Sequence, residues 1–546
     1  MPGPNFTQTR RSVQPLRPHS ALTFRYMPSV EDLLPIVDLS YCCFPGRPYT
    51  ASPVSGRCVS SPATPSSLDH SLVSGIAWTA LLRWFAQIIS WIATLYAARL
   101  LAPGDYGLVS MAMLAIGLAR MVEDFGLDAV LVQDRNIVGE ARARLAGFLL
   151  AIALALCALY ALAAPLIAGF FSEPHVTPII MTLSLVFLAD ALQVVPRAQL
   201  QRELRFGRLA MATLVQVITT SVVLVVAARA GLGHWSLVVN TLAGALAATV
   251  LLIVWEPYTI AWPRDLGRLA RPFLQGWRIL ASRIAWYGYT NVDQTLVGRV
   301  LGKDALGAYS FAVTFSNIAQ QEVGAVVSRV VPGIFSEIQN NRAELRRYFL
   351  LLTEFLAVII FPCTIGLALT ADLVMPLLLG PQWSEVVTPL RLLCINAAFL
   401  ASQTLLSHVL MWTGQFRANM WCTVVAGVMM PLVLWFAVDY GLPGIGWAWV
   451  IFMPIATIPT FVLAFRTLEL TTMDWVDSIK PALVATLLMS AAVIGVRSVL
   501  PPTIPLVAQT ALAIGVGAAT YAVVVWFVFG ARIKALLSIA RSIRTR

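Results

Sequence analysis

Two stretches of sequence that lie 200 residues apart decide the fold class. Residues 99–112 read RLLAPGDYGLVSMA, and residues 299–312 read RVLGKDALGAYSFA. Aligned without a gap, the two stretches share an arginine, a leucine, a glycine, a serine and an alanine. In the segment before each stretch, Arg83 falls on Arg283. Chance similarity between apolar helices is the alternative, but apolar composition does not produce matched arginines and glycines. We therefore predict an internal repeat.

Both stretches lie in a series of apolar segments that begins at residue 74. Each segment has roughly 20 residues, the length that a helix needs to cross the hydrocarbon core of a bilayer. Of the 546 residues, 58% are apolar and only 12% are charged, which excludes a soluble globular protein, a disordered chain and a coiled coil. We predict fourteen transmembrane helices, at 75–98, 105–123, 145–168, 176–196, 209–229, 234–255, 273–298, 306–331, 347–370, 386–411, 418–438, 443–465, 480–499 and 506–529.

The predicted fold is an all-α polytopic membrane protein with two six-helix repeats and two additional C-terminal helices. Six spans are an even number, so the repeats have the same orientation and are related by a pseudo-two-fold axis along the membrane normal. The net charge is +11, and the excess of arginine lies in alternate short loops. This bias predicts that both termini are cytoplasmic. It explains the positive charge without nucleic-acid binding.

These patterns divide the chain into six parts. Residues 1–72 are expected to be a disordered cytoplasmic tail, or the product of a misannotated translation start. The other predicted parts are a first lobe at 73–256, a cytoplasmic linker at 257–272, a second lobe at 273–466, two C-terminal helices at 467–530 and a basic tail at 531–546.

Polar side chains recur on single faces of the first helices of each repeat. The spacing i, i+4, i+7, i+11 places such residues on one helix face. The candidate substrate-binding residues on these faces are Arg83, Gln87, Arg283, Tyr287, Thr290, Gln294, Asn317 and Gln321.

A stripe of this kind cannot face lipid, because a central Arg or Asp costs roughly 2.5–3.5 kcal/mol even on the lenient insertion scale. We predict a hydrophilic, cationic cavity between the repeats, lined mainly by spans 1, 7 and 8. Arginine suits a phosphate-bearing substrate because its planar fork binds two oxygens at once. Two alternatives stay open: Arg83 can snorkel to the interface, and the other polar side chains can join helices to one another.

Four acidic residues in the spans are candidates for ion coupling: Asp190, Asp293, Glu322 and Glu354. Structural pairing with a nearby arginine is the alternative for each. The sequence has no phosphate-binding loop of the GxxxxGK[ST] type and no HExxH, CxxC or GxSxG motif. We therefore predict no catalytic residue, no metal site and no cofactor.

Three segments resemble a known family. Residues 74–112 (SGIAWTALLRWFAQIISWIATLYAARLLAPGDYGLVSMA), 125–133 (FGLDAVLVQ) and 291–312 (NVDQTLVGRVLGKDALGAYSFA) are similar to the polysaccharide-exporter branch of the multidrug/oligosaccharidyl-lipid/polysaccharide exporter superfamily. Colanic-acid exporters and O-antigen flippases belong to this branch. The resemblance covers residues 70–530.

The resemblance implies a flippase of the bacterial inner membrane. Such a protein moves an undecaprenyl-diphosphate-linked oligosaccharide to the periplasmic leaflet by alternating access, for capsule, exopolysaccharide or O-antigen synthesis. Arg83 and Arg283 would then contact the diphosphate, and the neighbouring polar residues would contact the sugars. The implied partners are this lipid-linked substrate, membrane lipids and the polysaccharide polymerase machinery. Two other functions stay open: a drug or cation antiporter of the same superfamily, and a membrane polymerase or ligase acting on the same lipid.

Overall fold

The computed structural model describes residues 65–123, 131, 139–262, 280–338, 341–501 and 503–544. All regular secondary structure in these ranges is helical, which confirms the predicted all-helical class. The chain divides into two units, Met1–Pro65 and Ser66–Arg546. The predicted tail lies outside the described residues up to residue 64, and the first helix begins at Pro65, ten residues before the predicted start at 75.

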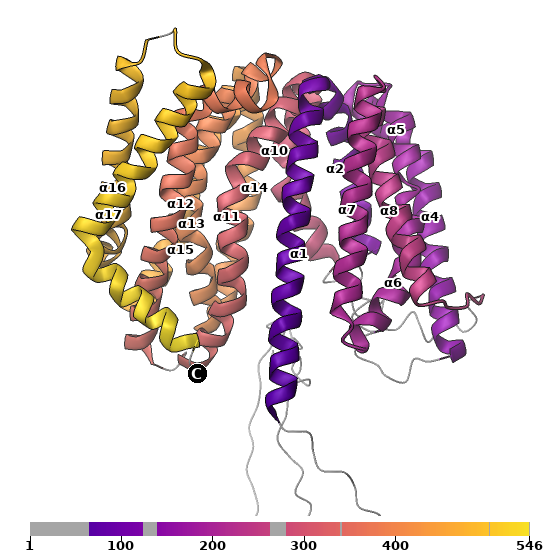
Figure 1. Ribbon diagram of the computed structural model, residues 1–546, viewed down its shortest axis with the longest axis horizontal. Helices are drawn as coiled ribbons and strands as arrows, with labels where there is room; N and C mark the ends of the chain where they lie inside the picture. The colour runs from indigo at the N-terminus through magenta and orange to yellow at the C-terminus, as the bar shows by residue number, and fades with distance from the viewer. Residues whose placement is uncertain are drawn as a thin grey trace, which may run out of the picture. The chain divides into compact units, whose positions relative to one another are not determined.

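The helices up to residue 256 form the first half. They are α1 (Pro65–Leu100), α2 (Pro103–Glu123), α4 (Gly139–Phe171), α5 (Val176–Leu183), α6 (Val186–Arg202), α7 (Phe206–Arg229) and α8 (Trp235–Trp255). Pro103 opens α2 with a fixed φ, and the Asp105 carboxylate accepts a hydrogen bond from the Ala102 N–H at 3.1 Å. Figure 1 shows α2 to α8 grouped together.

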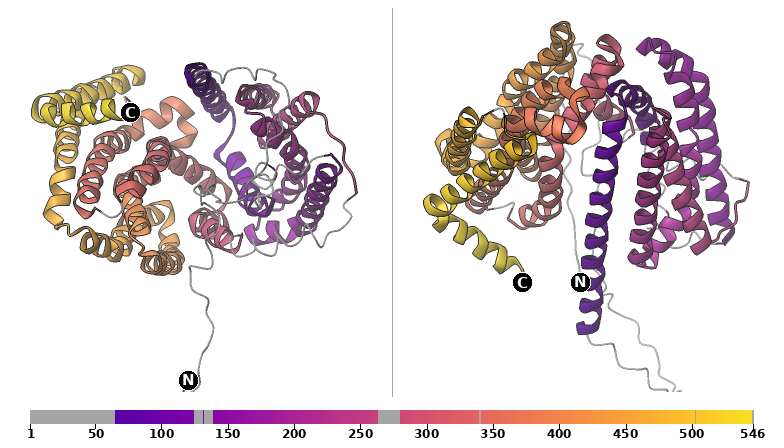
Figure 2. Two further views of the ribbon diagram at one scale, coloured as in Figure 1. Left: turned by 90° about the horizontal axis from the view of Figure 1, so that it is seen from below. Right: turned by 45° about the horizontal axis from the view of Figure 1, so that its top comes forward.

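The second half runs from residue 280 to Leu468. Residues 280–290 are helical, and they are followed by α10 (Val292–Val300), α11 (Gly302–Ile338), α12 (Arg342–Leu379), the short 3₁₀ helix η2 (Pro381–Val386), α13 (Val387–Trp412), α14 (Phe416–Ala437), η3 (Val438–Tyr440) and α15 (Gly441–Leu468). The hairpin of α16 (Thr472–Val499) and α17 (Leu506–Arg544) follows and packs against α12. Figure 2 shows these helices as a second group.

Among the described residues, nine segments are long and apolar enough to cross a membrane. They contain ten of the predicted spans, because one of them, Phe416–Leu468, holds both α14 and α15. The described parts of the other four predicted spans fall in α1, α2, residues 280–300 and α11, and residues 273–279 of the predicted span 273–298 lie outside the described residues. Each of these four predicted spans includes residues or side chains outside the described part of the chain. The predicted total of fourteen spans therefore stays a prediction.

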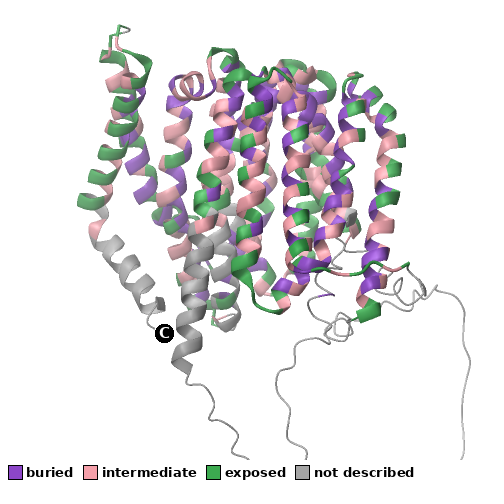
Figure 3. Ribbon diagram, turned by 45° about the vertical axis from the view of Figure 1, so that its right-hand side comes forward, coloured by how far each residue is buried: buried purple, intermediate pink, exposed green. Residues whose placement is uncertain are grey.

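Large apolar side chains cover the outside of the helical unit. Leu162 is 78% exposed and Phe436 is 72% exposed. Exposed green faces run along the outer helices in Figure 3. A soluble monomer rarely exposes contiguous apolar surface on this scale, whereas lipid covers it in a membrane. The chain is a multi-pass membrane protein.

The two halves meet where α2 packs against α11. Gly107 and Gly307 make the close approach possible: a Cβ added to Gly107 would lie 1.8 Å from the Lys303 carbonyl oxygen, and one added to Gly307 would lie 1.9 Å from the Pro103 carbonyl oxygen. Between the same helices, Ser110 Oγ lies 3.3 Å from Ser310 Oγ. Glycines 200 positions apart thus make equivalent contacts, and serines with the same separation contact each other.

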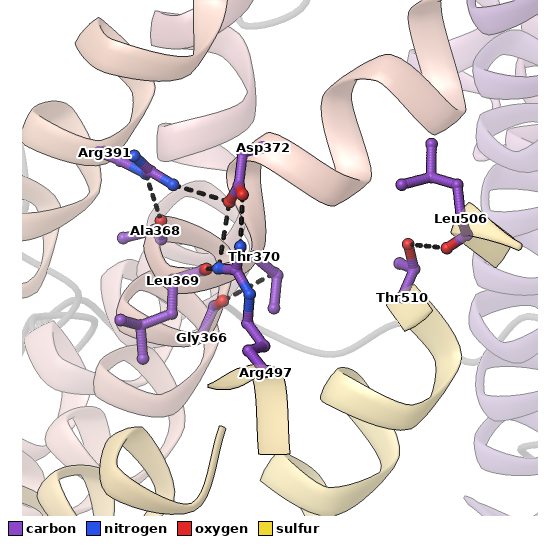
Figure 4. A network of polar contacts seen from close by, with 9 residues as sticks. All are labelled: Gly366, Ala368, Leu369, Thr370, Asp372, Arg391, Arg497, Leu506 and Thr510. Carbon is purple, nitrogen blue, oxygen red and sulfur yellow. Dashed lines mark hydrogen bonds and ion pairs between the residues drawn. The ribbon is translucent and has the colours of Figure 1, made fainter. Parts of the chain in front are cut away.

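The C-terminal hairpin is attached to the second half by a carboxylate that two arginines share. Asp372 on α12 accepts a hydrogen bond from Arg391 on α13 at 2.7 Å and is also paired with Arg497 on α16 (Figure 4). Arg497 also donates to the carbonyl oxygen of Leu369 on α12. Charged hydrogen bonds of this type are stronger than neutral ones, so they orient α16 against α12.

Replacement of Arg497 by alanine is expected to loosen this attachment. The change leaves Asp372 with Arg391 alone and should lower the stability of the folded state by about 1.5–3 kcal/mol, the range for a hydrogen bond to a charged group. The measurement is thermal unfolding of the purified protein, with limited proteolysis to report the release of α16. Lys480→Ala, on the same helix, is the matched control. An unchanged unfolding temperature and cleavage pattern in Arg497→Ala would contradict the assignment.

Candidate polar cavity

The second half holds a half-open cavity of about 930 Å³, lined by polar and apolar side chains. Its walls come from residues 286–290, α10, α11, α13, α14 and α15. Along α11 the lining runs from Val313 to Gly324, about 16 Å at 1.5 Å per residue. This length is about half of a hydrocarbon core of ~30 Å. The volume lies near the upper end of the range for small-molecule sites, roughly 300–1,000 Å³. We call this space the second-half cavity.

Four of the predicted site residues line the second-half cavity: Thr290, Asp293, Asn317 and Gln321. Asn317 and Gln321, which the helical spacing placed on one face, both line the cavity from α11. Gln87, Arg283, Tyr287 and Gln294 are not among its lining residues. The side chain of Arg83 lies outside the described residues, so its predicted role is not addressed.

The second-half cavity differs from the predicted chamber in its place and in its charge. All of its described lining residues come from the second half, whereas the predicted chamber lies between the halves. Among the described lining residues there is no lysine or arginine, and Asp293 is the one carboxylate. Tyr287 shows why this residue does not line the second-half cavity. Its hydroxyl donates a hydrogen bond to the Leu114 carbonyl oxygen of α2 at 3.0 Å, so this face of its helix packs against the first half.

Asp293 lies at one wall of the cavity in a closed set of hydrogen bonds. It is 4% exposed, and its Oδ2 accepts from the Tyr309 hydroxyl at 2.7 Å and from Trp449 Nε1 at 3.2 Å. Trp449 Nε1 also lies 3.2 Å from the Tyr309 hydroxyl oxygen. The N–H of Gln294 donates to Oδ1 at 2.7 Å. These hydrogen bonds compensate for the removal of the carboxylate from water.

The other candidate acids lie in different surroundings. Asp190 on α6 forms an ion pair with Arg120 on α2 at 3.3 Å, which is the structural pairing that the sequence left open. Glu322 is exposed and Glu354 is half-buried, and neither lines the second-half cavity. Among the described residues, no group of three or more His, Cys, Asp or Glu side chains could hold a metal ion.

Several cavity residues were not among the candidates from sequence. Trp286, Tyr289 and Asn419 line the walls, and Tyr309 bonds to Asp293. Tyr309 and the tryptophans look like ordinary apolar residues of a span, so no periodic pattern separates them from the core. Asn419 and Thr423 are four residues apart in an apolar span, and this spacing was a usable signal.

The arginines of the two repeat stretches each reach the opposite half. Arg99, at the end of α1, donates to the carbonyl oxygens of Leu377 and Leu378 at the end of α12. Arg299, at the end of α10, donates to Ser172 Oγ just after α4 at 2.6 Å. Beside them, Lys303 forms an ion pair with Glu173 at 3.3 Å. Equivalent arginines therefore join the halves at the ends of α1 and α10.

A protein-family model with the description "Polysaccharide biosynthesis protein" matches residues 97–388, more than half of the chain. This chain belongs to that family. The membership confirms the resemblance found in the sequence. The matched residues include α2, α11 and the contact between the two halves.

Several proteins that are similar in sequence to this chain have names that refer to polysaccharide biosynthesis. The Escherichia coli lipopolysaccharide biosynthesis protein WzxC is 26% identical over 60% of this chain and 67% of its own length. The Rhizobium meliloti succinoglycan biosynthesis transport protein ExoT is 23% identical over 72% of this chain and 83% of its own length. The Bacillus subtilis teichuronic acid biosynthesis protein TuaB is 25% identical over 60% and 68%, respectively.

Two solved structures share the fold. The lipid II flippase MurJ in an inward closed conformation aligns with a TM-score of 0.65 at 12% identity, over 84% of this chain and all of that chain. A multidrug resistance MATE family transporter in an inward-facing conformation aligns with a TM-score of 0.55 at 14% identity, over 70% of this chain and 94% of that chain. The chain therefore has a MurJ-like and MATE-like fold.

Proposed function

We propose that this protein moves a lipid-linked oligosaccharide across the bacterial inner membrane for the synthesis of a surface polysaccharide. The observation that carries the proposal is the polar second-half cavity inside a lipid-exposed helical body of the polysaccharide biosynthesis family. A polar headgroup needs such a path, because each unsatisfied polar group costs several kcal/mol in hydrocarbon. The names of WzxC, ExoT and TuaB support a polysaccharide substrate. The name of ExoT, a transport protein, weighs against a membrane polymerase or ligase.

The transport step is alternating access of two parallel six-helix repeats, with fourteen spans and both termini cytoplasmic. The equivalent contacts of Arg99 and Arg299, and of Gly107 and Gly307, fit two halves that close symmetrically at one membrane face. By the loop charges, this face is periplasmic, so the described state is closed to the periplasm. Arg83 and Arg283 would contact the diphosphate at the cytoplasmic entry.

Asp293 is the coupling residue in this proposal. Its carboxylate is the one acidic group among the described lining residues of the cavity, and Tyr309 joins it to α11. The groups around Oδ2 are O–H and N–H donors, which cannot ligate a metal cation through their hydrogens. The arrangement therefore favours coupling to a proton over coupling to a metal ion.

Deletion of the gene, followed by complementation with variants, tests the proposal. Cells without the protein are expected to lose surface polysaccharide and to accumulate the lipid-linked precursor on the cytoplasmic side. Arg83→Ala and Arg283→Ala should restore less than about a tenth of the wild-type output, since the loss of one charged phosphate contact exceeds 1.4 kcal/mol. Immunoblots control for expression. Normal polysaccharide in the deletion strain would refute the function, and full complementation by both variants would refute the diphosphate contact.

A drug or cation antiporter is the second candidate. The observation that favours it is that Asp293 is the one carboxylate of the described lining, which has no lysine or arginine. The same deletion strain separates the two functions: loss of an antiporter leaves surface polysaccharide unchanged and raises sensitivity to cationic drugs.

A further inference from the structure

We propose that the second-half cavity binds the first sugar of the lipid-linked oligosaccharide, and that this sugar is uncharged. Trp286 and Tyr289 form its stacking surface, and the amides of Asn317, Asn396 and Asn419 bind its hydroxyl groups. The inference rests on the proposed export function and assigns the cavity to one part of that substrate.

Two aromatic rings stand together at the wall of the cavity. The ring centroids of Trp286 and Tyr289 are 5.6 Å apart, with an interplanar angle of 52°. Gly427 on α14 lies against the Tyr289 ring, since a Cβ there would be 3.7 Å from Tyr289 Cδ2. Trp286 is 58% exposed, so its ring is open to a ligand. One face of a pyranose ring carries only C–H groups, and an aromatic face covers such apolar surface while the hydroxyls point sideways.

Two amide oxygens at the cavity have unused hydrogen-bonding capacity. Asn396 on α13 is 7% exposed, and its Oδ1 has no hydrogen-bond partner among the described residues. The Oδ1 of Asn419 on α14 is in the same situation within the described part of the chain. Both side chains line the cavity. Buried polar atoms are bonded in the large majority of cases, so these two oxygens call for donors from a ligand.

Sugar hydroxyls match these amides, since a hydroxyl and an amide each both donate and accept hydrogen bonds. Asn317 on α11 faces the same space, so three helices present amides to one ligand. A site built in this way distinguishes ligands by their hydroxyl groups, because a missing hydroxyl leaves a buried amide unpaired.

The described lining of the cavity offers no lysine or arginine to pair with an acidic sugar or with the diphosphate. An uncharged sugar fits this lining better. The diphosphate therefore stays outside. Arg283 is three residues before Trp286 in the same helical segment, so the two are neighbours on the helix surface. A diphosphate near Arg283 places the next group of the substrate, the first sugar, beside Trp286.

The test compares two lipids on the purified full-length protein in nanodiscs. One is undecaprenyl diphosphate, which has no sugar, and the other is the lipid-linked precursor isolated from the deletion strain. The wild type is expected to bind the precursor at least about tenfold more tightly. Trp286→Ala and Asn396→Ala should each lose most of this difference while binding of undecaprenyl diphosphate is unchanged. Trp435→Ala, at an exposed tryptophan of α14 outside the cavity, is the matched control.

Trp286→Phe keeps an aromatic face and is expected to retain most of the preference, which separates stacking from misfolding. Two results would overturn the inference: unchanged preference in both Trp286→Ala and Asn396→Ala, or a uronic acid as the first sugar of the isolated precursor. Either result leaves the export function intact, because that function depends on the loss of polysaccharide in the deletion strain.

Discussion

A disulfide between cysteines at positions 110 and 310 is expected to abolish export and to release it again on reduction. Ser110 Oγ and Ser310 Oγ are 3.3 Å apart across the contact between α2 and α11. A Ser110→Cys/Ser310→Cys variant places two sulfurs where only a small adjustment is needed for a bond of about 2.05 Å. In the proposed alternating-access mechanism the halves separate at this contact, so a covalent link would hold the protein closed.

The measurement is polysaccharide export after mild oxidation and again after addition of dithiothreitol, with mass spectrometry to identify the linked peptides. The expected activity is less than about a tenth of that of the reduced protein. Each single-cysteine variant, treated in the same way, controls for oxidation of the native cysteines. Full export by the linked protein would rule out separation at α2 and α11. Failure of the disulfide to form would contradict the 3.3 Å contact itself.

Replacement of Asp293 by asparagine is expected to reduce export at least about tenfold without unfolding the protein. The asparagine oxygen can still accept the hydrogen bonds of Tyr309 and Trp449, whereas its NH2 group takes the place of the oxygen that accepts from the Gln294 N–H, so two of the three hydrogen bonds are retained. An amide cannot gain and release a proton, so coupling to a proton gradient is lost. Export in cells and the thermal unfolding of the purified variant are the two measurements.

Tyr309→Phe is the informative companion. It removes the 2.7 Å hydrogen bond to Asp293 and keeps the carboxylate, so it should retain more export than Asp293→Asn and lose more stability. If Asp293→Asn exports at the wild-type level, the carboxylate has a structural role only. A reversed order of the two variants in export would also exclude Asp293 as the coupling group.

The membrane class could be predicted from sequence because it depends on the local sum of side-chain hydropathies. Hydropathy over about 20 residues identifies a span without reference to any other span. A displacement of 200 positions relates Gly107 to Gly307 and Ser110 to Ser310. The sequence predicted that the halves are related by an axis. It did not predict that these residues lie near the axis, where a residue meets its own equivalent.

The candidate site was predicted only in part. A stripe of polar residues shows which face of a helix points inward, but it does not show which other helix that face packs against. Tyr287 and Thr290 belong to one predicted face, yet Tyr287 bonds to the first half and Thr290 lines the second-half cavity. Asp293 and Trp449 are 156 positions apart, and no periodicity joins them. Such pairs depend on how each helix is rotated and tilted.

The sequence by itself thus determined that the chain is a helical membrane protein with a repeated pattern and polar interior faces, because the cost of polar groups in lipid acts on each helix separately. The tertiary structure alone decided that the cavity lies within the second half and has no lysine or arginine in its described lining. Packing between helices sets which polar faces meet, and a rotation of one residue moves a side chain by about 100° around the axis of a helix with 3.6 residues per turn.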